Sequence, residues 1–352
     1  MIKDKSIFIK NIYYMLSYAF QALNQGEFEN IAKESFDNIH DLFAAILVKG
    51  IGRQLKQGLY KEYIEVSDDL SVLRGKININ NTIQHKISKR QLLSCEYDEL
   101  SENNLLNQIL KTTSVLLLKQ KDVSSERKGL LKKELLFFSN VDEIDLRLIR
   151  WSSVRFQKNN ISYITLIGIC RLIIEGMLLT TEEGQYKLAS FIDDQHMERL
   201  YEKFILEYYR KECPQINANA SQINWALDDG NNAYLPIMQS DITLSKGSDV
   251  LIIDAKYYTH TMQQQYDSYS YHSNNLYQIF TYVKNKDAEF KDKPHRVSGM
   301  LLYAKTDEDV QPNSSYPMSG NDISIQTLDL NTDFSNIALQ LNKIVSEYFF
   351  EN

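Results

Sequence analysis

The segment spanning residues 240–258 constrains the fold more than any other part of the chain. Two apolar-rich runs flank Gly247-Ser248, and a two-residue type II′ turn needs a positive φ at its first central position, which glycine adopts without a steric penalty. The pattern therefore predicts a β-hairpin in which Lys246 pairs with Asp249. The same register pairs Ser245 with Val250, Thr243 with Ile252, and Asp241 with Asp254.

The predicted hairpin brings charged side chains together on one face. Side chains alternate between faces along a strand, so Lys256 joins Asp241 and Asp254 on one side. Two carboxylates opposed across strands destabilise each other unless something neutralises them. Mg²⁺ does so, since it is commonly held by one or two carboxylates and a substrate phosphate. We therefore expect Asp241 and Asp254 to hold Mg²⁺, with Lys256 orienting a water molecule or stabilising charge on the phosphate. The opposite face is apolar and comprises Ile242, Leu244, Leu251, Ile253 and Ala255.

Two helices flank the hairpin in sequence and offer further candidates. The helix predicted over residues 195–212 has an apolar stripe bordered by Glu202, which is a candidate third metal ligand. Glu198 lies one turn earlier on the same flank and is an alternative to it. In the helix predicted over residues 273–286, Gln278 lies beside the apolar face and is a candidate contact for the water or the phosphate.

Charge and missing motifs exclude several functions. The 39 Lys and Arg residues against 46 Asp and Glu give a net charge of −7, so a DNA contact must be local or supplied by a partner. No phosphate-binding loop occurs, which argues against binding of nucleoside triphosphates by this chain. Three cysteines without C-x-x-C spacing fit neither a disulfide framework nor a zinc ribbon, and indicate a reducing cytoplasm.

The 352 residues suggest two domains. A polar stretch over residues 180–186 follows an apolar helix and marks the expected boundary. We predict a partner-docking domain over residues 1–185, helical with a β-rich segment over about 58–98, and a second domain over residues 186–352. The second domain alternates strands and helices, so the fold class is α/β, or α+β overall, with a mixed sheet flanked by helices.

The elements follow from hydrophobic periodicity. Helices are expected around residues 12–23, 39–57, 102–119, 126–138, 161–179, 195–212 and 273–286, and from residue 334. Strands are expected over residues 60–66, 71–79, 91–97, 299–304 and 322–329, in addition to the hairpin within residues 236–258.

An acidic residue, a hairpin and then Asp-x-Lys together resemble the PD-(D/E)XK nuclease core, with Ser240 where that pattern has proline. A set of further motifs resembles the McrC family, the nuclease subunits of McrBC-type restriction systems. These motifs span nearly the whole chain and are Asn11-Ile-Tyr-Tyr-Met-Leu-Ser-Tyr-Ala-Phe20, Arg74-Gly-Lys-Ile77, Tyr97-Asp-Glu-Leu-Ser-Glu-Asn-Asn-Leu-Leu-Asn107, Leu200-Tyr-Glu-Lys-Phe204, Leu251-Ile-Ile-Asp-Ala-Lys-Tyr-Tyr258 and Asn275-Leu-Tyr-Gln-Ile279.

The resemblance implies that Asp241, Asp254 and Lys256 are catalytic, with Glu202 and Gln278 as companions. It also implies a partner, a McrB-like AAA+ ring that hydrolyses GTP and reads modified cytosine in double-stranded DNA. In this family the amino-terminal half docks into the ring and stimulates hydrolysis. The basic stretches over residues 53–61 and 74–90 are candidates for the docking tip.

The leading hypothesis is an Mg²⁺-dependent DNA endonuclease subunit of a modification-dependent restriction complex. Two alternatives stay open at this point. One is a non-catalytic activator or adaptor of the AAA+ GTPase, which would stimulate its partner without binding Mg²⁺. The other is a stand-alone nuclease of the same superfamily, which would cut DNA without nucleotide.

Overall fold

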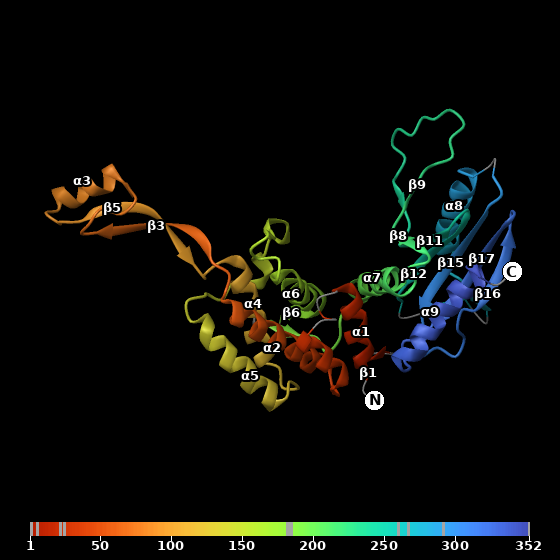
Figure 1. The fold of residues 1–352 in the computed structure, drawn as a ribbon, viewed down its shortest axis with the longest axis horizontal. Coiled ribbons are helices and arrows are strands. Elements are labelled where there is room, and N and C mark those ends of the chain that lie inside the picture. The colour runs from red at the N-terminus through yellow and green to blue at the C-terminus, as the bar shows by residue number, and fades with distance from the viewer. Residues whose placement is uncertain are drawn as a thin grey trace. The chain divides into compact units, whose positions relative to one another are not determined.

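The computed structural model describes residues 3–4, 7–20, 23, 26–180, 186–258, 261–265, 268–290 and 293–350. The chain forms two compact units. One comprises residues 43–174, and the other joins residues 1–42 to residues 175–352 (Figure 1). Among the described residues, no helix has both the length and the apolar character needed to cross a membrane.

The unit of residues 43–174 is a helical body that carries a strand segment. Its helices are α2 (Ile39–Gln57), α4 (Leu105–Leu118), α5 (Ser125–Leu135) and α6 (Tyr163–Met177), with α2 and α6 continuing into the other unit. Tyr163 ties the body to the strands, because its hydroxyl accepts a hydrogen bond from Tyr60 N at 2.9 Å and donates one to Asn107 Oδ1 at 2.8 Å. This buried polar junction sets where the strands leave the helices.

The strand segment is a three-stranded antiparallel sheet, β3 (Glu62–Leu70), β5 (Leu93–Ser101) and β4 (Lys76–Ile77), in that order. The strand predicted over residues 71–79 is wrong for most of its length, because residues 71–75 form a turn, only Lys76–Ile77 is a strand, and α3 (Ile79–Ile87) begins at the last residue. The Asn78 side chain caps this helix by accepting a hydrogen bond from Asn81 N. Gly75 has a φ of +65°, and a Cβ atom there would lie 2.4 Å from Glu96 O, so this turn needs glycine.

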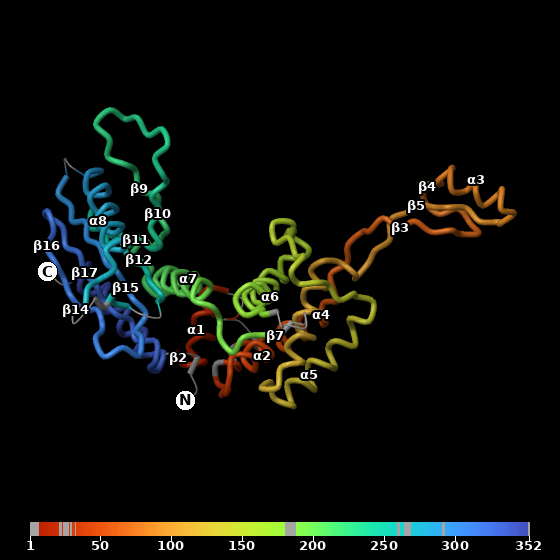
Figure 2. Tube along the Cα trace, turned by 180° about the vertical axis from the view of Figure 1, so that it is seen from behind, coloured from red at the N-terminus to blue at the C-terminus, as the bar shows by residue number. Residues whose placement is uncertain are grey.

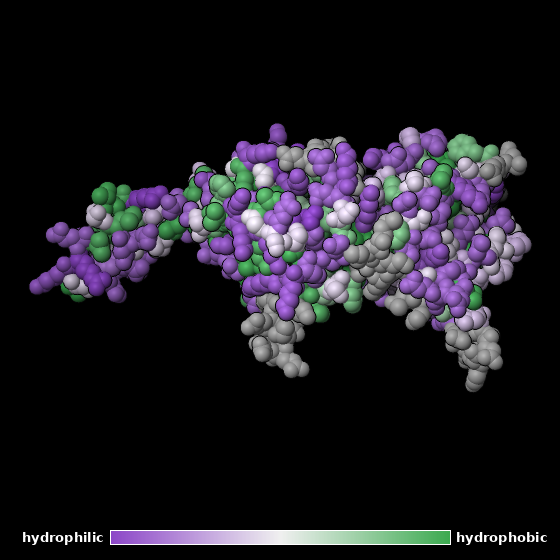
Figure 3. Space-filling view, turned by 90° about the horizontal axis from the view of Figure 1, so that it is seen from below, coloured by the Kyte–Doolittle hydropathy of each residue, from purple (hydrophilic) through white to green (hydrophobic). Residues whose placement is uncertain are grey.

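Hydrophobic side chains are exposed at the far end of the strand segment. Figure 3 shows green patches among hydrophilic side chains there. A surface of this kind is typical of a protein interface rather than of a free surface. The exposed residues are Val72, Leu73, Ile79, Ile83 and Ile87.

Glu134 of α5 makes the stability of this unit depend on pH. Burial raises its pKa to about 8, and Oε2 has no hydrogen-bond partner among the described residues. A carboxyl with a raised folded-state pKa costs stability as pH rises from about 4.5 to about 8, because the folded state must lose a proton that it holds more tightly. We expect Glu134→Gln to stabilise the chain by about 1–2 kcal/mol at pH 9 and by less at pH 5. Thermal melts at both pH values measure this.

The matched control is Glu143→Gln, since Glu143 is exposed in the same unit. Its melting temperature should follow that of the wild type at both pH values. A gain for Glu134→Gln that is equal at pH 5 and pH 9 would show that ionisation of Glu134 is not the cause.

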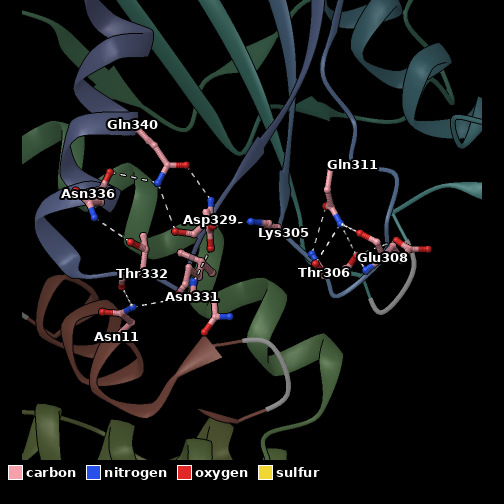
Figure 4. Close-up of polar contacts among 11 residues, drawn as sticks. Asn11, Lys305, Thr306, Glu308, Gln311, Asp329, Asn331, Thr332, Asn336 and Gln340 are labelled. Atoms are coloured by element: carbon pink, nitrogen blue, oxygen red, sulfur yellow. Dashed lines mark hydrogen bonds and ion pairs between the residues drawn. The ribbon is translucent and has the colours of Figure 1, made fainter. Parts of the chain in front are cut away.

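The other unit includes the first helix of the chain, α1 (Ile9–Ala19), although the sequence assigns residues 1–185 to one domain. The contacts of α1 explain this. Asn11 Nδ2 donates to Leu330 O at 2.8 Å and to Thr332 O at 2.7 Å (Figure 4), and Tyr18 donates to Glu212 Oε1 at 2.9 Å. These partners lie more than 190 residues away, and no local periodicity reveals them.

A six-stranded mixed sheet forms the centre of this unit, and it confirms the expected fold class. Strands β12, β15 and β17 are parallel, and β16, β11 and β8 add antiparallel edges. The order is β16 (Ser314–Met318), β17 (Asn321–Leu328), β15 (Arg296–Ala304), β12 (Asp249–Lys256), β11 (Ile242–Lys246) and β8 (Asn217–Asn219).

Helices cover the sheet, as Figure 2 shows. Helix α8 (Ser273–Ala288) buries Ile279 and Val283 against Val250 and Ile252 of β12. Helix α7 (Asp194–Glu212) places Tyr201 against Tyr257, with ring centroids 6.4 Å apart. Side chains alternate along β12, so α7 and α8 lie on opposite faces. A third helix, α9 (Phe334–Phe349), closes the chain.

Most expected helices are confirmed, with ends shifted by a few residues. Short elements escaped the prediction because a few residues carry no periodicity. The remaining described strands are β1 (Lys3–Asp4), β2 (Ile7–Phe8), β6 (Leu178–Thr180), β7 (Tyr186–Leu188), β9 (Gln222–Ile223), β10 (Met238–Gln239), β13 (Gln263–Gln265) and β14 (Ser268–Ser270), and 3-10 turns occur over Gly26–Lys33, Leu136–Phe138, Leu146–Leu148 and Trp151–Ser153.

Candidate active site

The hairpin of β11 and β12 has the predicted register. Gly247 has a φ of +63°, and Lys246 pairs with Asp249 across a two-residue turn. The paired ladder ends at Ile242 and Ile253, so the predicted strand pair of Asp241 with Asp254 does not form. Asp241 follows directly, and its Oδ2 accepts a hydrogen bond from Ala255 N at 2.9 Å. This bond turns the Asp241 side chain towards the end of β12, where Asp254 and Lys256 lie.

Asp254 and Lys256 form a buried ion pair. Asp254 is 1% exposed and Lys256 is 9% exposed, and Lys256 Nζ lies 3.0 Å from Asp254 Oδ2. This burial has a structural cause, because β12 lies inside the sheet with α8 over the face that carries both side chains. The face of β12 that carries Asp254 and Lys256 is therefore covered by α8 and does not face solvent. Its charged side chains lie at the end of the strand.

The neighbouring carboxyl group of Asp241 changes the pKa of both members of this pair. Burial raises the pKa of Asp254, Lys256 acts against that rise, and Asp241 adds to it. For Lys256, burial acts to lower the pKa, but the carboxylates of Asp254 and Asp241 outweigh it and raise the pKa. Lys256 is therefore charged at neutral pH, and it faces more negative charge than it can neutralise.

The charges of this cluster also act on both glutamates of α7. Burial first, and then Asp241, Glu198 and Asp254, raise the pKa of Glu202 to about 8, while Lys256 lowers it. Burial likewise raises the pKa of Glu198, which Lys256 lowers and Asp241 raises. Four carboxyl groups thus interact electrostatically with one ammonium group, and Glu202 is the more strongly perturbed of the two glutamates.

The donor set fits a divalent cation bound through few protein ligands. Neither oxygen of Asp254 has a hydrogen bond of acceptable geometry within the described part of the chain, although both are buried. Buried carboxylate oxygens are costly unless they are satisfied; Oδ2 has the Lys256 ammonium group 3.0 Å away, and a cation would satisfy Oδ1. The described residues include no cluster of three or more His, Cys, Asp or Glu side chains arranged to hold a metal. Mg²⁺ does not require one, because it retains several waters.

Gln278 lies on α8, and its Nε2 donates a hydrogen bond to Tyr282 OH at 3.1 Å within the same helix. The structure therefore joins Asp241, Asp254 and Lys256 at the end of β12 through short contacts, and Glu202 interacts with them electrostatically, while Gln278 bonds to its own helix. Its proposed contact with water or phosphate stays a prediction.

The sequence did not single out a buried polar chain beside the site. Tyr258 OH donates to Asn275 Oδ1 at 3.4 Å, and Asn275 Nδ2 donates to Tyr303 OH at 2.9 Å. Tyr303 pairs in register with Lys256 on the neighbouring parallel strand. Only that pairing, which no local pattern predicts, brings the tyrosine to the site.

The fold and the site together define the class of this protein. It is a mixed α/β protein with a buried Asp and Lys pair at the end of a central strand. A family described as McrBC 5-methylcytosine restriction system component matches residues 4–304, and the chain belongs to this family. The expected family resemblance is thereby confirmed.

The chain is also similar to individual proteins. It is 28% identical over 348 residues to the Type IV methyl-directed restriction enzyme EcoKMcrBC of Escherichia coli strain K12, covering 97% of both chains. A chain in the half-complex from a tetradecameric assembly of Thermococcus gammatolerans McrB AAA+ hexamers with bound McrC has a similar fold. The TM-score is 0.53 and the identity 20%, over 96% of this chain and 76% of that one.

Proposed function

We propose that this chain is the DNA endonuclease subunit of a modification-dependent restriction complex and that it hydrolyses phosphodiester bonds with Mg²⁺. The meeting of Asp241, Asp254 and Lys256 at the end of β12 carries the proposal. These residues stand where the PD-(D/E)XK nuclease pattern has its acids and lysine. A cytoplasmic location fits this role, since the three cysteines are free and buried.

Asp241 and Asp254 would hold the ion, with Glu202 or Glu198 able to hold a coordinated water. When bound, Mg²⁺ supplies a more acidic water and neutralises charge on the phosphate. Lys256 keeps its ammonium charge beside Asp254, so it can orient the attacking water and stabilise the negative charge that develops on phosphate oxygens. Burial excludes bulk water from this ammonium group and strengthens both effects.

We further propose that the chain acts with a GTP-hydrolysing AAA+ partner, which reads the modified DNA and which the chain stimulates. The fold neighbour is described as McrC bound to McrB AAA+ hexamers, and the E. coli relative is described as methyl-directed. The exposed apolar end of the β3 and β5 segment supports a docking role for it. The lack of a phosphate-binding loop in this sequence fits a motor supplied by another chain.

The test is reconstitution with the partner on methylated double-stranded DNA, comparing wild type with Asp254→Ala. We expect cleavage to fall by about 100-fold or more, since a metal ligand is lost, while stimulation of the partner's GTP hydrolysis persists. Calorimetric titration with Mg²⁺ or Mn²⁺ should show binding by the wild type and none by the variant. Cleavage by Asp254→Ala at the wild-type rate would refute the nuclease site.

A further inference from the structure

An arm formed by residues 222–239 precedes the site in the chain and projects from the sheet (Figures 1 and 2). At its base, β9 pairs with β10 through Ile223 with Met238 and Gln222 with Gln239. Ser240 fixes this base to the start of β11, because its Oγ lies 2.7 Å from Thr243 Oγ1 and its N donates to Ser221 O at 3.0 Å. The arm therefore ends two residues before Asp241 and is held to the same strand.

The arm is held by hydrogen bonds between its two sides and by one with α8. Trp225 Nε1 donates to Pro236 O at 2.8 Å across the two sides of the arm, and Ala226 N donates to Asn285 Oδ1 of α8 at 2.7 Å. Side chains of Asp229 and Asn231 each accept a hydrogen bond from a backbone N–H two residues ahead, which shapes the tip. A segment ordered in this way loses little entropy on binding.

A cavity of about 370 Å³ lies in the arm. Its size is at the lower end of the range of about 300–1,000 Å³ typical of small-molecule sites. Neutral amide side chains and one indole provide its polar and aromatic chemistry: Gln222, Asn224, Asn232 and Trp225.

Tyr234 at the tip is fully exposed and has a φ of +66°. For a bulky residue this left-handed conformation is strained, and such strain clusters at ligand clamps. Ile237, nearby in the arm, is 76% exposed. The arm thus exposes Tyr234 and Ile237 to water, and the backbone at Tyr234 is strained.

Charge decides what the arm can bind. Residues 212–245 contain no Lys, Arg or His, while Asp228 and Asp229 lie at the tip. Phosphate contacts come mainly from cations, so this arm is unsuited to bind the DNA backbone. Asn and Gln side chains pair with base edges, and aromatic rings stack on bases without needing charge. The rest of the lining is mainly apolar, with Ile223, Leu227, Leu235, Pro236, Ile237 and Met238. Apolar walls with a few amide groups suit the flat face and the polar edge of a base.

We propose that the arm contacts bases of the DNA substrate next to the scissile phosphate, with base edges received by the amide-lined cavity and Tyr234 stacking on a base. The inference rests on the proposed nuclease function and extends it, because it assigns base contacts to a chain whose partner is expected to read the modification. The covalent continuity between Gln239 and Asp241 would place these contacts at a fixed distance from the cut.

The first test is photocrosslinking of the complex with its AAA+ partner, using DNA that carries 5-iodouracil at single positions on either side of the cut. The Asp254→Asn chain keeps the DNA intact. We expect crosslinks to Trp225 or Tyr234 from a few positions near the cut. Crosslinks confined to other segments, or absent from the arm at every position, would overturn the inference.

The second test measures DNA affinity and cut positions for Tyr234→Ala and for Asn224→Ala/Asn232→Ala. We expect about fivefold or greater weakening of binding, altered cut positions and an unchanged dependence on salt, because no phosphate contact is lost. Leu339→Ala, which removes an exposed apolar side chain from α9, is the control and should match the wild type.

These tests separate the arm from the nuclease site. If Asp254→Ala abolishes cleavage while the arm variants bind and cut as the wild type does, the arm inference fails and the nuclease proposal stands. If the arm variants change the molecular mass of the complex and leave DNA affinity untouched, the arm is a protein interface and the inference fails. If Asp254→Ala cuts normally but the arm crosslinks to bases, the nuclease site fails alone.

Discussion

Lys256→Ala is expected to lower DNA cleavage by about 100-fold or more and to destabilise the chain by about 3 kcal/mol. The two effects have different causes. Cleavage falls because the ammonium group that orients water and offsets phosphate charge is lost. Stability falls because Asp254, which is 1% exposed, then lacks its counter-ion at 3.0 Å and keeps Asp241 beside it. Cleavage by the reconstituted complex and urea unfolding of the chain measure the two effects.

A double variant separates these effects. Asp254→Leu/Lys256→Met replaces the pair with apolar side chains of similar size, and removing both members of a buried ion pair is often neutral or stabilising. We expect it to unfold at or above the wild-type urea concentration and to cleave no DNA. If the double variant is as unstable as Lys256→Ala, an unpaired buried charge is not the cause of the lost stability, and the packing of the two side chains is.

The arrangement of the β11 and β12 hairpin could be predicted because its information is local. Gly247 fixes the turn, the turn fixes the register, and the register puts Asp241 and Asp254 at the same end. What lay beyond the hairpin was only partly predictable. The apolar stripe of α7 indicated Glu202, whose role stays a prediction, whereas Tyr303 and Asn275 reach the site through a parallel pairing and a helix packing that no short pattern encodes.

The division of the chain was harder to predict than its elements. Periodicity locates α1, but the contacts of Asn11 with Leu330 and Thr332 decide to which unit it belongs. The helix α3 was missed although Ile79, Ile83 and Ile87 recur at four-residue spacing on one face, because the run up to Ile79 was interpreted as a strand. Its start was nevertheless signalled by Asn78, a preferred N-cap residue. The cap and the spacing of the isoleucines therefore both indicate this helix, although its apolar face is exposed.

Gly299→Val is expected to have the largest effect on stability, about 3 kcal/mol or more, and to lower cleavage with it. Gly299 lies in β15 where α8 crosses the sheet, and a Cβ atom there would lie 2.7 Å from Val283 Cγ2 and 2.8 Å from Ile279 Cγ1. Overpacking by a single methyl group costs about 1–3 kcal/mol in a filled core, so Gly299→Ala should have a smaller effect in the same direction. Raising α8 from the sheet would also shift Asn275 away from Tyr303 and open the site to water. A paired Gly299→Ala/Val283→Ala variant, which removes the Cγ2 atom nearest to the new methyl group, should recover part of both stability and cleavage relative to Gly299→Ala. If thermal melting shows no recovery, strain in β15 itself, and not contact with α8, sets the requirement for glycine.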